Sequence, residues 1–240
     1  MKRTDFTLKP SLIAMLAAAT LLTACGDDND DDTVIVTPPA PVMQTFTVTV
    51  TNLTANQPMS PVILASHASD AMLWNAGEMA SEALEKMAEG GDTADIAALS
   101  VINSSVNGTG LLMPGMSETL TLTLDEAEVA SISLATMLVN TNDAFTGINS
   151  YTIAGMEVDA TTAMKFMAYD AGTEANSEAK GSMPGPADGG EGFNAIRDDV
   201  DFVHIHPGVI SMYDSLADSV LDASHRFDNP VLAVTIMRTE

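Results

Sequence analysis

Cysteine is almost absent from this chain of 240 residues: Cys25 is the only one, so no disulfide bond can form within the chain. Basic residues are also scarce, with 9 lysines and arginines against 33 acidic residues and a formal net charge of −24. A surface of this charge repels the phosphates of nucleic acids and of anionic lipids, so we expect no nucleic-acid binding. Divalent cations are its natural partners, and a solvated acidic surface without a specific ligand is the alternative.

Long apolar runs are missing as well. The most apolar segment, residues 11–22, is shorter than the about 18 to 20 residues that a membrane-spanning helix needs. It follows Lys2, Arg3 and Lys9, and it leads into the sequence LTAC, which ends at Cys25. This is the layout of a bacterial secretory signal, and LTAC resembles the lipobox at which the cysteine sulfur receives diacylglycerol. An ordinary secretory signal with an incidental cysteine is the alternative.

The chain therefore divides into three predicted parts. Residues 1–24 are a lipoprotein signal peptide, and the lipid on Cys25 would hold the protein at a membrane, because each buried methylene contributes about 0.8 kcal/mol. Residues 25–43, rich in Asp and Pro, are an extended tether. Residues 44–240 form one domain. Gly26 resembles the enterobacterial sorting pattern for the outer membrane, so we expect an outer-membrane lipoprotein that is either periplasmic or surface-exposed.

Period-two alternation dominates the predicted domain. Phe46, Val48 and Val50 alternate with threonines, which is typical of a half-buried strand. Helical spacing is confined to residues 80–102, where a Gly-Gly pair separates two short helices. Many strands and few helices predict an all-β fold, an antiparallel β-sandwich with a small helical insertion. Further strands are expected at residues 60–68, 117–125, 130–143, 161–170, 201–208 and 230–238.

Residues 44–237 contain the sequences SPVILASHA, SLATMLVNTNDAFTG, YDAGTEANSE, GPADGGEGF and HPG. With these motifs the segment resembles the bacterial members of the spondin-domain family, whose animal members are extracellular-matrix proteins. The resemblance implies a sandwich of about eight antiparallel strands, akin to the calcium-binding sandwiches of membrane-docking proteins. It also implies a calcium ion held among loop carboxylates.

Two of these motifs place acids after predicted strands. Asp143 follows one strand, and Asp170 and Glu174 flank the turn after another. Calcium takes about six to eight oxygen ligands, and Gly172 would allow a turn sharp enough for the acids to face one point. We therefore predict a calcium site formed by Asp143, Asp170 and Glu174, with an unoccupied polar turn as the alternative. Asn142 is either a further oxygen donor or a turn residue, and Glu174 stands where the animal pattern has Asp.

The histidines offer a second candidate metal site. His204 and His206 are two residues apart in a predicted strand, so their rings would share one face. Such a pair could bind zinc, copper or iron if a third ligand, for example His67, His225 or Glu191, lay nearby. Two hydrogen-bonded structural histidines are the alternative, and the spondin-domain pattern does not require the pair.

No nucleophile elbow and no phosphate-binding loop stands in the sequence, so an enzyme has no support from motifs. We expect a lipid-anchored, non-catalytic calcium-binding module that takes part in adhesion or cell-envelope interactions. Its partner would be an extracellular or envelope protein or glycan. The first alternative is a metal-dependent periplasmic enzyme that uses His204 and His206 on a transition metal, and the second is a structural envelope protein without any ion.

Overall fold

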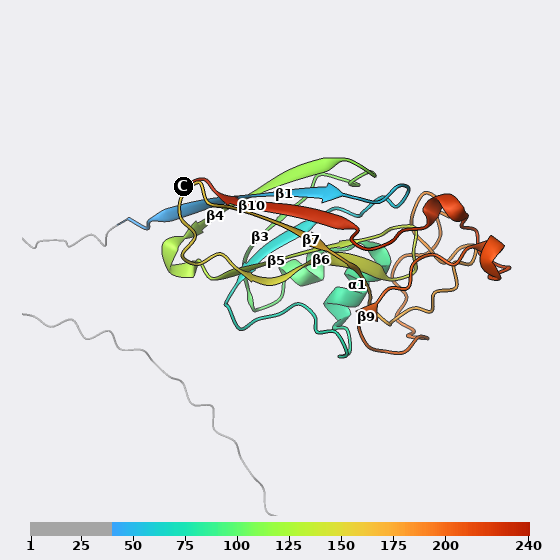
Figure 1. The fold of residues 1–240 in the computed structure, drawn as a ribbon. Helices are drawn as coiled ribbons and strands as arrows, with labels where there is room; N and C mark the ends of the chain where they lie inside the picture. Colours follow the sequence, from blue (N-terminus) through green and yellow to red (C-terminus); the bar gives the residue numbers. More distant parts are fainter. Residues whose placement is uncertain (1–39) are drawn as a thin grey trace, which may run out of the picture. The chain divides into compact units, whose positions relative to one another are not determined.

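Two antiparallel β-sheets lie face to face in the part of the chain that the computed structural model describes, residues 40–240 (Figure 1). The predicted signal peptide, Cys25 and most of the predicted tether lie outside these residues. One sheet has four strands in the order β4-β1-β10-β7, and the other has six in the order β3-β2-β5-β6-β8-β9. The predicted all-β sandwich with a small helical insertion is confirmed.

The elements of the described residues are mostly short. The strands are β1 (Met43–Asn52), β2 (Ile63–His67), β3 (Ile102–Asn107), β4 (Ser117–Asp125), β5 (Ser131–Met137), β6 (Ala144–Thr152), β7 (Thr161–Phe166), β8 (Ala168–Asp170), β9 (His204–Ile205) and β10 (Leu232–Arg238). The helices are α1 (Glu82–Gly90) and α2 (Ala94–Ala97), with 3-10 turns η1 (Glu126–Glu128), η2 (Met212–Asp214) and η3 (Ala223–His225).

The core between the sheets comes from alternation within the strands of the four-stranded sheet. In β1, Phe46, Val48 and Val50 are fully buried, while the threonines between them are half-buried. β4 and β10 pair with β1 on either side, and their apolar residues alternate in the same way. The apolar face that results packs on Leu64 and Leu134 of the other sheet. Burial of this face is the main hydrophobic contribution that holds the two sheets together.

The six-stranded sheet is covered on both faces. Every residue of β2 and β5 is buried. Side chains on the outer face, among them Met137 and Phe145, pack against α1 and Trp74. The helical insertion thus forms a third layer, visible in Figure 1 beside this sheet. A strand buried on both faces is mostly apolar, and in β5 even Ser131, Ser133 and Thr136 are fully buried.

Helix α1 has clear signals at both ends. The Ser81 hydroxyl accepts a hydrogen bond from the Leu84 N–H at 3.2 Å, which is the usual N-terminal cap. Gly91 ends the helix with φ +70°, a left-handed conformation that glycine adopts without strain. These two signals set the bounds of α1, which carries the buried acids Glu85 and Glu89.

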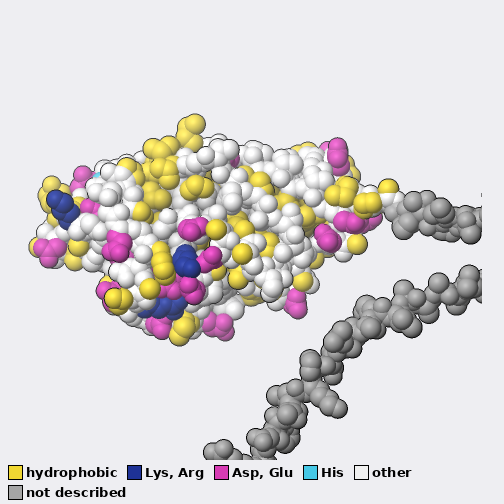
Figure 2. Space-filling view, turned by 180° about the vertical axis from the view of Figure 1, so that it is seen from behind, with side chains coloured by type: hydrophobic (Ala, Val, Ile, Leu, Met, Phe, Trp, Pro, Cys, Tyr) yellow, Lys and Arg dark blue, Asp and Glu magenta, His cyan; other side chains and the backbone are white. Residues whose placement is uncertain are grey.

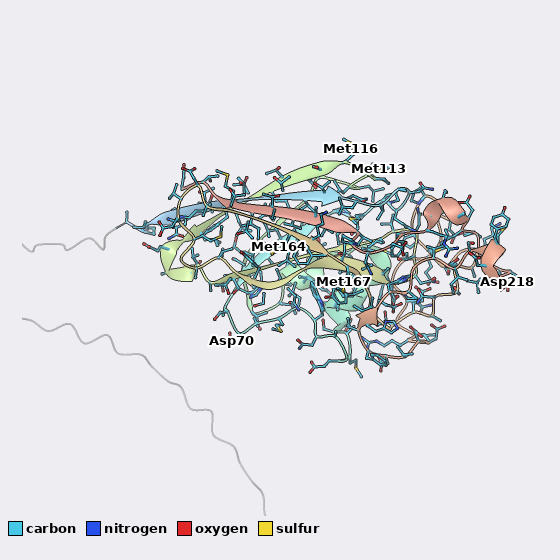
Figure 3. All side chains as sticks on the ribbon, viewed as in Figure 1. Asp70, Met113, Met116, Met164, Met167 and Asp218 are labelled. Carbon is cyan, nitrogen blue, oxygen red and sulfur yellow. The ribbon has the colours of Figure 1, made fainter. Side chains whose placement is uncertain are left out.

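The ten strands of residues 40–240 include two, β3 and β6, in segments without an individually predicted strand, whereas the strand expected at residues 201–208 is reduced to β9. The strand expected at 161–170 is divided, because β7 pairs with β10 in one sheet and β8 pairs with β6 in the other. Met167, labelled in Figure 3, stands at this crossing and is 41% exposed. One apolar run therefore contributes a strand to each sheet, and local alternation in the sequence does not predict this division.

The two ends of the sandwich differ. β1 begins and β10 ends at one end, while the long connections between β8 and β10 gather at the other (Figure 1). On the face shown in Figure 2, acidic side chains are spread over the surface and the basic ones lie beside acidic ones. Within residues 40–240, no helix is long and apolar enough to cross a bilayer.

Candidate metal centre

Three strand ends of the six-stranded sheet meet at one position. Ala144, the first residue of β6, pairs with Asp170, the last of β8, and Asp170 also pairs with His204, the first of β9. Asp143 directly precedes β6. Because paired residues on antiparallel strands lie about 5 Å apart, the sheet brings these distant parts of the sequence into one cluster.

Asp143 is fully buried, and its two oxygens have different surroundings. Oδ2 accepts hydrogen bonds from the Thr173 N–H at 2.8 Å, from the Thr173 hydroxyl at 3.2 Å and from the Glu174 N–H at 3.2 Å. Oδ1 has no hydrogen-bond partner among the described residues. An unsatisfied buried polar atom costs about 1–3 kcal/mol, so Oδ1 is an atom that an added ligand would satisfy.

Asp170 is also fully buried and is held through both oxygens. Oδ1 accepts the Gly172 N–H at 2.8 Å, a local turn contact typical of Asp, and lies 3.5 Å from His204 Nδ1. Oδ2 accepts a hydrogen bond from Asn176 Nδ2 at 2.6 Å and lies 3.9 Å from His206 Nε2. The carboxylate is thus oriented by the turn at Gly172, by Asn176 and by the two histidines.

The two aspartates repel each other. The pKa of Asp143 is raised well above its ordinary value, first by burial and then by the negative charge of Asp170. No lysine or arginine of residues 40–240 forms an ion pair with either side chain. Buried like charges without a cation are costly, so a bound cation would stabilise this pair.

Gly172 shapes the turn after β8. Its φ is +70°, and a Cβ at this position would lie 2.3 Å from the Phe202 carbonyl oxygen, so only glycine fits. N–H groups of the segment 198–203 donate to the carbonyl oxygens of Gly172 at 2.7 Å and Thr173 at 3.1 Å. The segment is therefore fastened against the turn, which brings Asp199 to the cluster.

Asp170, Asp199 and His204 form the one group of three in residues 40–240 whose ligand atoms suit a shared metal ion, because one such atom from each lies within 4.8 Å of the others. His204 Nδ1 makes no hydrogen bond within the described chain, although it lies 3.5 Å from Asp170 Oδ1. Burial and then the charge of Asp170 raise the pKa of Asp199, while His204 lowers it. This group mixes two carboxylates with an imidazole.

His206 has a structural role in the same cluster. Its Nδ1 accepts the Gly208 N–H at 2.9 Å, so the proton of the neutral ring is on Nε2, which donates to Asn176 Oδ1 at 3.0 Å. Burial lowers the pKa of His206 to about 4, and the ring is therefore neutral at physiological pH. With both nitrogens engaged, His206 supports Asp170 through Asn176.

Glu174 contacts Asp143 through its backbone, but its carboxylate lies against Asn142. Oε1 accepts a hydrogen bond from Asn142 Nδ2 at 2.9 Å, and Oε2 is buried without a partner in the described part. Burial, ahead of the charge of Glu89 and other acids, raises the pKa of Glu174 to about 7. Asn142 uses its own oxygen to accept the Glu178 N–H at 3.1 Å, so it acts as a loop-ordering residue here.

The structure brings Asp143 and Asp170 together and adds His204 and Asp199. Sequence reasoning missed Asp199, since the adjacent acids of the sequence RDDVDF carry no periodicity that would single one out. The third ligands considered for the histidine pair, His67, His225 and Glu191, are outside the group of three. His67, for example, is buried with its ring nitrogens against the Ala68 carbonyl and Ser133.

Comparison with known proteins assigns a family to the part of the chain that contains Asp143 and Asp170. A search of the curated proteins finds no match to this chain. The family model described as Spondin_N matches residues 49–183, which is more than half of the chain and includes both Asp143 and Asp170. Spondin_N is a non-enzymatic domain family, and a match to it indicates an extracellular, adhesion-type module. The chain belongs to the Spondin_N family.

Proposed function

We propose that this chain is a non-catalytic, calcium-binding adhesion module, anchored to the bacterial cell envelope by a lipid on Cys25. Membership of the Spondin_N family supports an extracellular, adhesion-type role. The observation that carries the calcium proposal is the buried pair of Asp143 and Asp170, in which Asp143 Oδ1 has no partner among residues 40–240.

The donors of this pair suit a hard cation. Calcium binds oxygen ligands and tolerates irregular geometry. Asp143 Oδ1 and the Asp170 carboxylate would hold the ion, while the N–H groups of Gly172, Thr173 and Glu174 already orient the two side chains. The ion would supply the positive charge that the buried pair lacks. Glu174 Oε2 is a reserve oxygen that would need a side-chain movement to join.

Calcium at this position would link two connections of the six-stranded sheet. Asp143 belongs to the connection between β5 and β6, and Asp170 ends β8. The long loops after β8 gather at the same end of the sandwich (Figure 1). Holding these loops in one arrangement would present a fixed surface for an extracellular or envelope protein or glycan, at a lower ordering cost on binding.

Titration calorimetry of the full chain, freed of divalent ions with EDTA, tests the calcium site. We expect one calcium ion per chain and a rise in Tm with calcium. Asp170→Asn should remove most of both effects, because one carboxylate cannot neutralise the ion. Asp218→Asn, an exposed aspartate on a distant loop labelled in Figure 3, is the matched control and should bind normally. No heat and no change in Tm for the unmodified chain would reject the site.

The lipid anchor has its own test. Expressed in a bacterium with two membranes, the chain should incorporate a labelled fatty acid and fractionate with the outer membrane. Cys25→Ser should lose the label and become releasable in soluble form, because the acyl chains provide the membrane affinity. A chain that is unlabelled but secreted would show that the signal is an ordinary one.

The alternative of an enzyme that uses His204 and His206 has less support from the geometry. Both nitrogens of His206 are engaged with Gly208 and Asn176, so this ring has no lone pair for a metal. Of the two rings, His204 is the one with a buried nitrogen that has no partner among the described residues.

A further inference from the structure

We propose that Asp170, Asp199 and His204 form a second metal site, which takes a borderline divalent ion of the zinc class. The three residues come from the end of β8, from the segment 198–203 and from β9. The site shares Asp170 with the proposed calcium site, but its donor set differs because it contains an imidazole nitrogen.

The distances within the group suit a small ion. One ligand atom of each residue lies within 4.8 Å of the other two, and Asp170 Oδ1 is 3.5 Å from His204 Nδ1. Two ligands bound tetrahedrally at about 2.1 Å from zinc are themselves about 3.4 Å apart. The oxygen and the nitrogen therefore already stand at the separation that a shared zinc ion would require.

The hydrogen bonding of His204 also supports a role as a metal ligand. Nδ1 is buried and makes no hydrogen bond within residues 40–240, although an aspartate oxygen is close. Its neighbour in the pair, His206, has hydrogen-bond partners for both nitrogens. A buried imidazole nitrogen normally has a partner, and a metal ion between His204 and Asp170 would provide one.

The surrounding charge favours a cation at this point. Asp143 is fully buried next to Asp170, and its Oδ1 lacks a partner in the described chain. No lysine or arginine of residues 40–240 pairs with Asp170 or Asp199. Two acidic side chains thus lie with one imidazole, a third acid lies next to Asp170, and an added divalent ion would offset the repulsion among the acids.

The elements that carry the ligands are held firmly. Backbone hydrogen bonds join the segment 198–203 to Gly172 and Thr173. Arg197, just before the segment, donates to Asp201 at 2.6 Å and to Glu85 of α1 at 2.6 Å. The ligands therefore converge without a large rearrangement, which lowers the ordering cost of binding a metal.

Parallel calorimetric titrations of the full, EDTA-treated chain with zinc chloride and with calcium chloride test this site. We expect one zinc ion per chain, and at least about tenfold weaker zinc binding in both His204→Asn and Asp199→Asn. Calcium binding by His204→Asn should stay within about twofold of the unmodified chain, because imidazole is not a calcium ligand. His225→Asn and Asp70→Asn, which change residues outside the group, are the matched controls.

The outcomes of these titrations separate the second metal site from the calcium site. Absence of zinc binding, or zinc binding that both variants retain, overturns the second site. Zinc binding without calcium binding supports this site and rejects the calcium site of the proposed function, whereas calcium binding alone does the reverse. Circular dichroism and Tm of each variant without metal show that it is folded. If Asp199→Asn does not fold, the His204→Asn comparison decides by itself, since the His204 side chain is about one-third exposed.

Discussion

At the scale of single residues, the main feature of this protein is a set of buried carboxylates, whose charge is costly to bury. Asp143 and Asp170 are fully buried side by side, and Glu89 is 1% exposed near the end of α1. Each must be neutralised by protonation, by hydrogen bonds or by a cation, because an unpaired buried charge is costly. Substitutions that remove the charge and keep the shape of the side chain, such as Asp→Asn and Glu→Gln, therefore test these residues most directly.

Asp143→Asn should stabilise the chain in the absence of calcium. The asparagine oxygen still accepts the Thr173 N–H, while its amide group donates to Asp170 instead of repelling it. We expect a gain of about 1–2 kcal/mol in unfolding free energy, and no rise in Tm with calcium. Thermal melts with EDTA and with excess calcium measure both. A variant that still gains Tm with calcium would contradict the assignment of Asp143 as a ligand.

Glu89→Gln should change how stability depends on pH. Burial raises the pKa of Glu89 above its ordinary value of 4.5. The folded state therefore holds a proton that the unfolded state has lost, so this residue makes the chain less stable as pH rises through that window. The variant should melt about 2–4 °C higher than the parent at pH 8, the equivalent of about 1 kcal/mol, and at the same temperature near pH 4.5.

Asn194 donates to Glu89 Oε2 at 2.8 Å, and the glutamine oxygen can accept the same N–H. Glu157→Gln, at an exposed position, is the control and should leave the pH profile unchanged. Equal Tm differences between variant and parent at both pH values would show that charge is not the cause.

At the scale of elements, the link between α1 and the segment before β9 is the contact that positions the cluster from outside the sheet. Arg197 donates to the Ala80 carbonyl at 2.8 Å and to Glu85 at 2.6 Å, and Glu85 is 4% exposed. Because the helical insertion packs on the outer face of the six-stranded sheet, this arginine ties the insertion to the ligands of the proposed second site.

Arg197→Met should destabilise the chain and weaken metal binding together. Removing the arginine leaves Glu85 buried without a cation, and we expect a loss of about 3 kcal/mol. It also releases Asp201, so zinc affinity should fall more than calcium affinity. Arg226→Met, which breaks an exposed pair with Asp214, should cost less than about 1 kcal/mol. Unchanged zinc affinity in a folded Arg197→Met would contradict the positioning role.

At the scale of the whole molecule, the excess of acidic residues acts on stability as a diffuse repulsion. The net charge is −24, and the acids are spread over the surface shown in Figure 2. Such repulsion acts over the Debye length, which shrinks from about 30 Å at 0.01 M to about 3 Å at 1 M salt. Stability should therefore depend on ionic strength independently of any specific site.

In thermal melts with EDTA, raising the sodium chloride concentration from 0.01 to 1 M should increase Tm by roughly a few degrees. Potassium chloride should have the same effect, because screening depends on ionic strength and not on the identity of the ion. Asp170→Asn should show the same salt response as the parent. A fall in Tm with salt, or a strong difference between the two salts, would argue against general screening.

Much of the fold could be predicted because its signals are local. Alternation at Phe46, Val48 and Val50 predicts β1 and its buried face, and the pair Gly90-Gly91 predicts the end of α1. The division of residues 161–170 between two sheets could not be predicted, since β7 and β8 form one apolar run and separate only through their pairing partners.

The candidate site also has a part that the sequence predicts and a part that it does not. The acids at Asp143 and Asp170 are visible in the sequence because they follow apolar runs, and Gly172 marks the turn between the acids at 170 and 174. That Asp143, Asp170 and His204 lie together depends on the order β6-β8-β9, and Asp199 joins them through backbone bonds of an irregular segment. Strand order and loop packing are set by contacts between distant residues, which no local periodicity encodes, so the tertiary structure alone decided which carboxylates meet.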